Sequence, residues 1–219
     1  VIICAALFLV ARLTTWLSYP RPESIANNSD LWRALWTGFR FDMAVVIRAN
    51  LLGLFISICC IPLPAMASHF GWLLNRYWGG LILVIAVWAS ILNFSYIGFF
   101  NRPIDSFAYV GLNYGAATIW PNVISMDPYG LRLLVGLSVT ALTLWSYRKI
   151  GEKIIELIGF VHVRRIPFFT LAILLPLMFL MALGRGTVST FPLSQRHLIV
   201  SSETAVNNIV PNGIVALYY

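Results

Sequence analysis

Long apolar runs, separated by polar segments, dominate the pattern along this 219-residue chain. Five of them reach or approach the roughly 20 residues that a helix needs to cross a bilayer. Tryptophan and tyrosine stand near the ends of several runs, as is typical of helices that end at a membrane–water interface. The pattern predicts five membrane-spanning helices, over residues 1–19, 43–63, 78–100, 129–147 and 166–183.

Three further segments have a different character. Residues 29–42 (SDLWRALWTGFRFD) are amphipathic and predict a helix lying in the outer interface, before the second span. Residues 104–124 are aromatic and nearly uncharged, which indicates an interfacial helix or a re-entrant element. From residue 184 onward, polar residues and turn formers predict short, irregular or helical pieces on the outer surface. The expected fold is all-α, with a membrane domain over 1–183 and an extracytoplasmic linker over 184–219.

Composition changes the picture by excluding whole classes of protein. Hydrophobic residues make up 59% of the chain and charged residues 11%, against roughly 45–50% and about 25% in soluble domains. A soluble domain, a disordered chain and a free nucleic-acid-binding domain are therefore excluded. Cys4, Cys59 and Cys60 all lie in apolar runs without a CxxC pair, so they predict neither a zinc site nor a disulfide framework.

The distribution of Lys and Arg predicts the orientation. With a cytoplasmic N-terminus, the inner loops 65–76 and 148–165 carry six basic residues in 30 positions. The outer segments 20–41, 101–128 and 184–219 carry a similar number of basic residues over nearly three times that length. The positive-inside rule therefore favours the N-terminus inside and the C-terminus outside.

Motifs of soluble enzymes are absent from the sequence, which has no GxSxG, HExxH, P-loop or GxGxxG. His69, His162 and His197 fall in three different loops, so a three-histidine metal site is not expected. No catalytic residue and no metal ligand can be assigned in this chain.

Ionisable residues at or near membrane depth are the informative positions, because an unpaired buried charge is costly. Arg40 and Asp42 lie two residues apart at the mouth of the second span, and such residues do not face each other on a helix. Each is therefore available to another helix or to a ligand. The alternative is that they anchor the span by reaching to the head-group level. The same two interpretations apply to Arg12, Arg48 and Arg132, with anchoring favoured.

A second polar cluster follows the third span, where an Arg-Pro step predicts the end of the helix after Asn101. Asn93 lies two turns earlier on approximately the same face. Arg102 and Asp105 are expected at the level of the outer phosphates, although a capped helix end with a surface ion pair would explain them equally. We predict one outward-opening groove for a phospholipid head group, lined by Arg40, Asp42, Asn101, Arg102 and Asp105.

Three segments together carry a family resemblance: GFRFDMA, NFSYIGFFNRPIDSFAY, and the tail LGRGTVSTFPLSQRHLIVSSETAVNNIVPNGIVALYY. They resemble the membrane half of the lipoteichoic acid synthase-like proteins, in the sulfatase branch of the alkaline phosphatase superfamily. Relatives include membrane-bound phosphoglycerol and phosphoethanolamine transferases. The resemblance implies a bacterial inner (cytoplasmic) membrane protein whose chemistry resides in a following extracytoplasmic domain.

That implied chemistry uses a threonine nucleophile and a divalent metal (Mn, Mg or Zn) to cleave a phospholipid head group. Thr187, Thr190 and Thr204 have no metal-binding cluster near them in the sequence, so no catalytic residue is carried over. This chain alone is expected to be inactive and to need no cofactor. Its expected partners are phospholipids, the membrane and its own C-terminal extracytoplasmic domain, with no nucleic acid.

Two functions from different classes remain open. The first is the membrane anchor and lipid-presenting half of a sulfatase-like transferase. The alternative is a non-enzymatic lipid-binding sensor or interaction subunit of the same fold. The chain starts at Val1 inside an apolar run and stops at Tyr219 without a helix cap, so we expect further sequence on both sides. The sequence after Tyr219 would discriminate the two.

Overall fold

Four long helices form the body of the computed structural model: α1 (Ile2–Ser18), α2 (Asn28–Cys60), α3 (Ala65–Phe100) and α6 (Tyr129–Gly159). Three short helical elements follow near the C-terminus: η1 (Gln195–Leu198), α8 (Thr204–Asn208) and α9 (Gly213–Tyr218). The residues that the structure describes are 1–18, 28–60, 65–106, 108, 129–159, 178, 181–182, 184–187 and 193–218.

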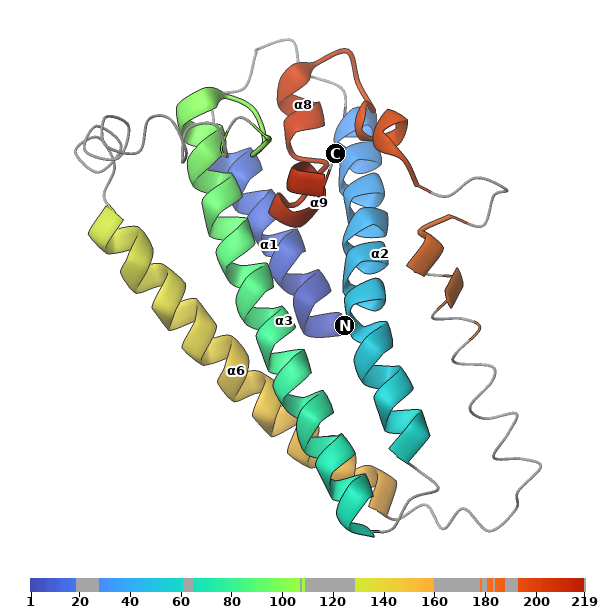
Figure 1. Ribbon diagram of the computed structural model, residues 1–219. Coiled ribbons are helices and arrows are strands. Elements are labelled where there is room, and N and C mark those ends of the chain that lie inside the picture. The colour runs from blue at the N-terminus through green and yellow to red at the C-terminus, as the bar shows by residue number, and fades with distance from the viewer. Residues whose placement is uncertain are drawn as a thin grey trace.

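Helix α3 is the central element, because it packs against α1, α2, α6 and α9. Helices α1 and α3 run in one direction, and α2 and α6 run in the other (Figure 1). Glycines let α6 approach α3 closely. A Cβ at Gly136 would lie 3.0 Å from Ile91 Cδ1, and one at Gly79 would meet the Tyr147 hydroxyl. Small residues at such crossings are typical of helices that pack within a membrane.

The all-helical class is confirmed for the described residues, among which no strand occurs. Two of these helices are long and apolar enough to cross a membrane, over Leu73–Phe100 and Gly130–Lys153. Helix α1 is apolar but has only 17 residues. The run 166–183 and the segment 104–124 lie largely outside the described residues. The count of five spans stays a prediction.

One expectation about local structure was wrong. Residues 29–42 do not form a separate helix before the second span, because α2 runs without a break through Asn28–Cys60. No proline interrupts these 33 residues, so nothing in the backbone forces the helix to end. The amphipathic pattern is instead explained by packing. Ala34, Phe41 and Ala44 are buried against Leu193, Val206 and Val210 of the C-terminal segment.

The C-terminal segment 193–218 is part of the helical bundle. Val206 and Val210 have no exposed surface and Val215 is 2% exposed. Helix α9 lies against α3 and α2, near the end of the bundle where α1 terminates and α2 begins (Figure 1). A Cβ at Gly213 would collide with the backbone oxygen of Ala89 in α3, so only glycine permits this approach. The expected short helical pieces are therefore present as η1, α8 and α9, but they pack among the long helices more closely than their polar composition suggested.

Candidate functional site

A buried ion pair joins α1 to α2. Arg12 Nη1 donates to Asp42 Oδ2 at 2.8 Å, and Arg12 Nη2 donates to Asp42 Oδ1 at 3.0 Å. The two side chains are 3% and 0% exposed, respectively. This two-donor geometry is the strong form of an arginine–carboxylate contact. It explains how two opposite charges are tolerated inside an otherwise apolar bundle.

The same arginine also holds the C-terminal segment. Arg12 Nε donates to the carbonyl oxygen of Ile209 at 2.7 Å, and Nη2 also donates to that of Val210 at 3.1 Å. The guanidinium lies directly on α2 at Gly38, where an added Cβ would collide with it. One side chain of α1 thus binds two other parts of the chain, α2 and the C-terminal segment.

Asn212 completes the arrangement from the C-terminal side. Its Nδ2 donates to Asp42 Oδ1 at 2.8 Å. Its Oδ1 accepts from the backbone N–H groups of Ile214 and Val215, at 3.0 and 2.8 Å. Asparagine in front of a helix is a preferred N-cap because it satisfies these first N–H groups. A single amide therefore both caps α9 and fixes that helix to the buried carboxylate. We call Arg12, Asp42 and Asn212 the buried polar triad.

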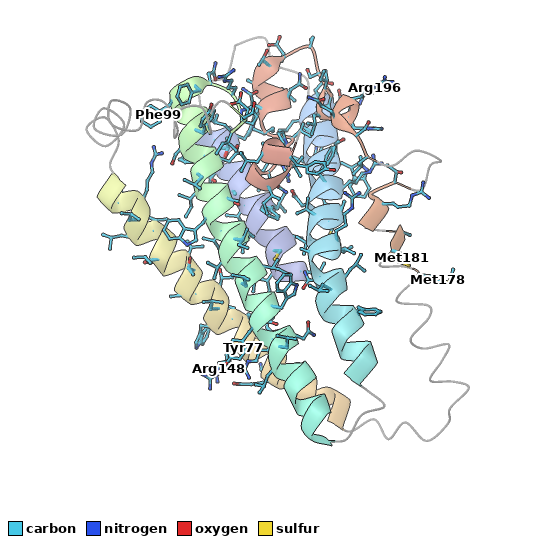
Figure 2. All side chains as sticks on the ribbon, viewed as in Figure 1. Tyr77, Phe99, Arg148, Met178, Met181 and Arg196 are labelled. Atoms are coloured by element: carbon cyan, nitrogen blue, oxygen red, sulfur yellow. The ribbon has the colours of Figure 1, made fainter. Side chains whose placement is uncertain are left out.

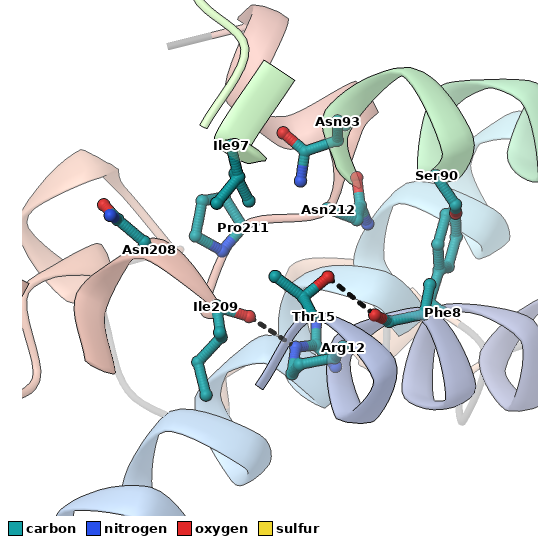
Figure 3. A pocket seen from close by; sticks show the side chains of 12 residues that line it. Phe8, Arg12, Thr15, Ser90, Asn93, Ile97, Asn208, Ile209, Pro211 and Asn212 are labelled. Atoms are coloured by element: carbon teal, nitrogen blue, oxygen red, sulfur yellow. Dashed lines mark hydrogen bonds between the residues drawn. The ribbon is translucent and has the colours of Figure 1, made fainter. Parts of the chain in front are cut away.

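A small polar cavity lies beside the triad (Figure 3). Its volume is about 20 Å³, and its lining includes Thr15, Ser90, Asn93 and Asn208. This volume suits about one water molecule and is far too small for a phospholipid head group. The hydrogen bonds described for the triad all join parts of this chain to one another, so we assign it a structural role.

Arg40 and Arg48 of α2 bind backbone carbonyls in the segment that precedes η1. Arg40 Nε donates to the Gly186 oxygen at 2.7 Å, and Arg48 Nε donates to the Gly184 oxygen at 3.0 Å. Gly186 has a φ of 68°, a left-handed conformation that glycine adopts without strain. These two arginines therefore bind α2 to the helical residues and turn at 184–186, and Arg40 also remains partly accessible.

The polar cluster after α3 forms a capped helix end with an ion pair. Asn101 adopts a φ of 51°, as expected for asparagine just past a helix C-terminus. Asn93 Oδ1 accepts from the Ile104 backbone N–H at 3.0 Å, which holds the chain after the turn. Arg102 pairs with Asp105 at 3.3 Å, and their side chains are 48% and 36% exposed. This end of α3, with its paired Arg102 and Asp105, carries the more accessible residues of the predicted groove.

The five predicted head-group residues are thus divided among three locations. Asn101, Arg102 and Asp105 share the end of α3, and the Asn101 carbonyl accepts from Asn208 Nδ2 at 2.8 Å. Arg40 contacts the loop at Gly186. Asp42 is fully buried in the triad, so it has no surface to offer a lipid.

Sequence reasoning missed the pairing of Arg12 with Asp42 and the role of Asn212. A signal for the first was present. Arg12 is the sole charged residue of the first apolar run, and an antiparallel second helix brings Asp42 to a similar depth. For Asn212 there was none, because its partner lies 170 positions away.

Comparison of the chain with protein-family models, with curated proteins and with solved structures finds no match. The residues that the structure describes hold no group of three or more His, Cys, Asp or Glu that could bind a metal ion. His197 accepts the Ser194 backbone N–H at its Nδ1, at 3.2 Å. No metal-dependent step is derived for this part of the chain.

Proposed function

We propose that this chain is the membrane-anchoring, lipid-presenting half of a sulfatase-like transferase that acts on phospholipid head groups at the outer face of the bacterial inner membrane. The proposal rests on the resemblance of three segments to the lipoteichoic acid synthase-like proteins. In this proposal a following extracytoplasmic domain supplies the phosphoglycerol or phosphoethanolamine transfer. Tethering that domain beside its lipid raises the effective substrate concentration without any new contact.

The exposed apolar surface of α6 supports a membrane location. Leu131, Leu134, Leu137, Leu142 and Trp145 are between 59% and 65% exposed. A continuous apolar face of this kind is unfavourable in water and is satisfied by lipid tails. The proposed five spans add α1, the second half of α2 and residues 166–183 to the two apolar helices.

The docked C-terminal segment is the single observation that carries the anchoring role. Its last helix, α9, is fixed to α2 and α3 by the buried polar triad and by the close contact at Gly213. A domain that follows such a segment would be held at a set height over the outer leaflet, whereas a flexible linker would let it drift. This is the geometry that a lipid-modifying enzyme needs.

We expect Arg102→Lys to lower head-group turnover several-fold in membranes from cells that express the full-length protein. Lysine keeps the charge but lacks the two-donor fork that suits a phosphate. Arg148→Lys is the matched control, since Arg148 also forms an exposed pair, with Glu152 at 3.0 Å, on a different helix. Turnover is measured as diacylglycerol released from labelled phosphatidylglycerol and phosphatidylethanolamine, at equal protein levels.

Wild-type turnover in Arg102→Lys would contradict head-group binding at the end of α3. An equal loss in Arg148→Lys would point to general damage. Arg40→Lys extends the test to the other accessible arginine of the predicted groove. Phospholipid binding without any turnover in the wild-type protein would favour the non-enzymatic sensor.

Topology gives an independent test. Figure 2 shows Arg148 and Tyr77 away from the end of the bundle that carries Phe99 and Arg196. Because Lys and Arg are concentrated in 148–165, we expect a reporter fused at Gly151 to be active only in the cytoplasm. A reporter fused after Leu217 should be active only on the opposite side. The reverse pattern would overturn the orientation.

A further inference from the structure

A groove lies between α1, α3 and the first half of α6. Its volume is about 420 Å³, within the range of ligand-binding pockets. Each helix lines it with one face, over residues 7–14, 87–94 and 131–139. This site is separate from the residues predicted to bind a head group, and it shares only Ala11 and Ser90 with the small polar cavity.

Helix α6 creates the groove by diverging from α3. The two helices touch where Gly136 meets Trp88 and Ile91, and again where Tyr147 meets Gly79. Toward its N-terminal end, α6 leans away from the other helices (Figure 1). The width of the groove therefore depends on the angle at which α6 crosses α3, and its walls are helices.

Polarity along the groove changes in one direction. Because α1 and α3 run opposite to α6, Thr14, Phe94 and Arg132 lie at one end. Leu7, Val87 and Val139 lie at the other. Each helix spans about seven residues between these ends, roughly 10 Å at 1.5 Å per residue. One end thus carries a cation, and the rest of the lining is apolar apart from Thr14 and Ser90.

The cation is held in position at the groove. The Arg132 guanidinium lies 5.6 Å from the centroid of the Phe94 ring, in the range of a cation–π contact. Arg132 also lies in the first turn of α6, where the helix dipole favours an anion over a cation. An anion bound at Arg132 would be attracted by both the guanidinium and the helix end.

We propose that this groove binds one anionic phospholipid of the outer leaflet, with its phosphate at Arg132 and one acyl chain along α1, α3 and α6. Under the proposed topology the cationic end faces the outer head groups and the apolar end points to the bilayer centre, which matches the polarity of such a lipid. The inference rests on the membrane location in the proposed function. It does not depend on transferase chemistry.

The test measures lipid retained by the purified, delipidated full chain after exposure to mixed micelles of phosphatidylglycerol or phosphatidylcholine, by native mass spectrometry. We expect one phosphatidylglycerol per chain, preferred over phosphatidylcholine by about tenfold, because the choline ammonium of phosphatidylcholine would be repelled by the Arg132 guanidinium. Arg132→Gln should abolish the preference. Inorganic phosphate at matched concentration should not displace the lipid, because it cannot fill the apolar part of the groove.

A second pair of variants tests the acyl-chain contact. Val139→Trp fills the apolar end and should lower retention of both lipids about tenfold. Leu137→Trp, on the exposed face of α6, is the matched control and should retain wild-type binding. Arg132→Gln leaves the groove open, so it tests lipid binding even if Val139→Trp fails to fold.

Three results would overturn the proposal: no preference in the wild-type chain, a preference that survives in Arg132→Gln, or equal retention by Val139→Trp and Leu137→Trp. The proposed head-group binding at the end of α3 is tested independently of the groove. If Arg102→Lys keeps full turnover while Arg132→Gln loses anionic lipid, the groove stands and the head-group site at the end of α3 does not.

Discussion

Replacement of Asp42 by alanine should lower the free energy of unfolding by about 3–5 kcal/mol, the effect of breaking a buried ion pair on one side. The substitution leaves the Arg12 guanidinium buried without its carboxylate, and it also removes the acceptor of Asn212 Nδ2. The measurement is chemical unfolding of the chain in detergent micelles, followed by circular dichroism.

The control is Glu152→Ala, which breaks the exposed pair with Arg148. No measurable change is expected there, because surface pairs contribute little. The double variant Arg12→Ala/Asp42→Ala should lose less stability than the sum of the two single variants, since it leaves no lone charge inside. Additive losses would show that the two side chains act independently and that the ion pair is not the stabilising unit.

Gly213→Val should weaken the docking of α9 and destabilise the chain by about 1–3 kcal/mol, the usual effect of overpacking. A Cβ at this position would collide with the Ala89 carbonyl, a backbone atom that cannot rotate away. We expect protease cleavage in the segment 193–218 to become faster, while cleavage elsewhere stays unchanged. Limited proteolysis with mass-spectrometric mapping measures both.

Gly151→Ala is the matched control, because a Cβ at Gly151 in α6 would meet nothing within 4 Å. It should leave cleavage of the tail unaltered and should stabilise α6 by up to about 1 kcal/mol, the difference in helix propensity between the two residues. If Gly213→Val leaves the tail as protected as in wild type, the contact with α3 does not hold the segment.

Hydropathy located the long helices because it depends on local composition, but it did not locate their ends. The segment 65–76 was expected to be an inner loop and instead forms the first part of α3 (Ala65–Phe100). The apolar run 78–100 lies within α3, and the helix ends at Phe100, directly before the asparagine that the Arg-Pro step had marked. The run 129–147 lies within α6, although that helix continues to Gly159. The prediction for 29–42 was wrong because an amphipathic pattern shows only that the two faces of a helix meet different surroundings. It does not tell whether the apolar face meets a membrane interface or another part of the chain.

The candidate site was harder to predict, since its contacts join distant parts of the chain. Arg102 and Asp105 are three residues apart, so their proximity could be predicted from spacing. Asp42 was singled out correctly as a charge needing a partner, but the partner came from α1 and from Asn212. The polar tail looked like surface because four of its buried positions (Asn208, Pro211, Asn212, Gly213) have no apolar signature. Their burial depends on hydrogen bonds and close backbone approach, which hydropathy does not measure.

The contacts of Arg12 also impose an order on the biogenesis of the protein. Asp42 follows Arg12 by 30 positions and emerges from the ribosome soon after it, but the carbonyls of Ile209 and Val210 follow by 197 and 198 positions. While the roughly 200 residues between them are being made, α1 must therefore wait with an incompletely bound guanidinium. Contacts between residues so far apart in sequence form late and slow the final assembly. Helix α1 precedes the other described helices in the sequence, yet it is thus among the last of them to reach its final environment.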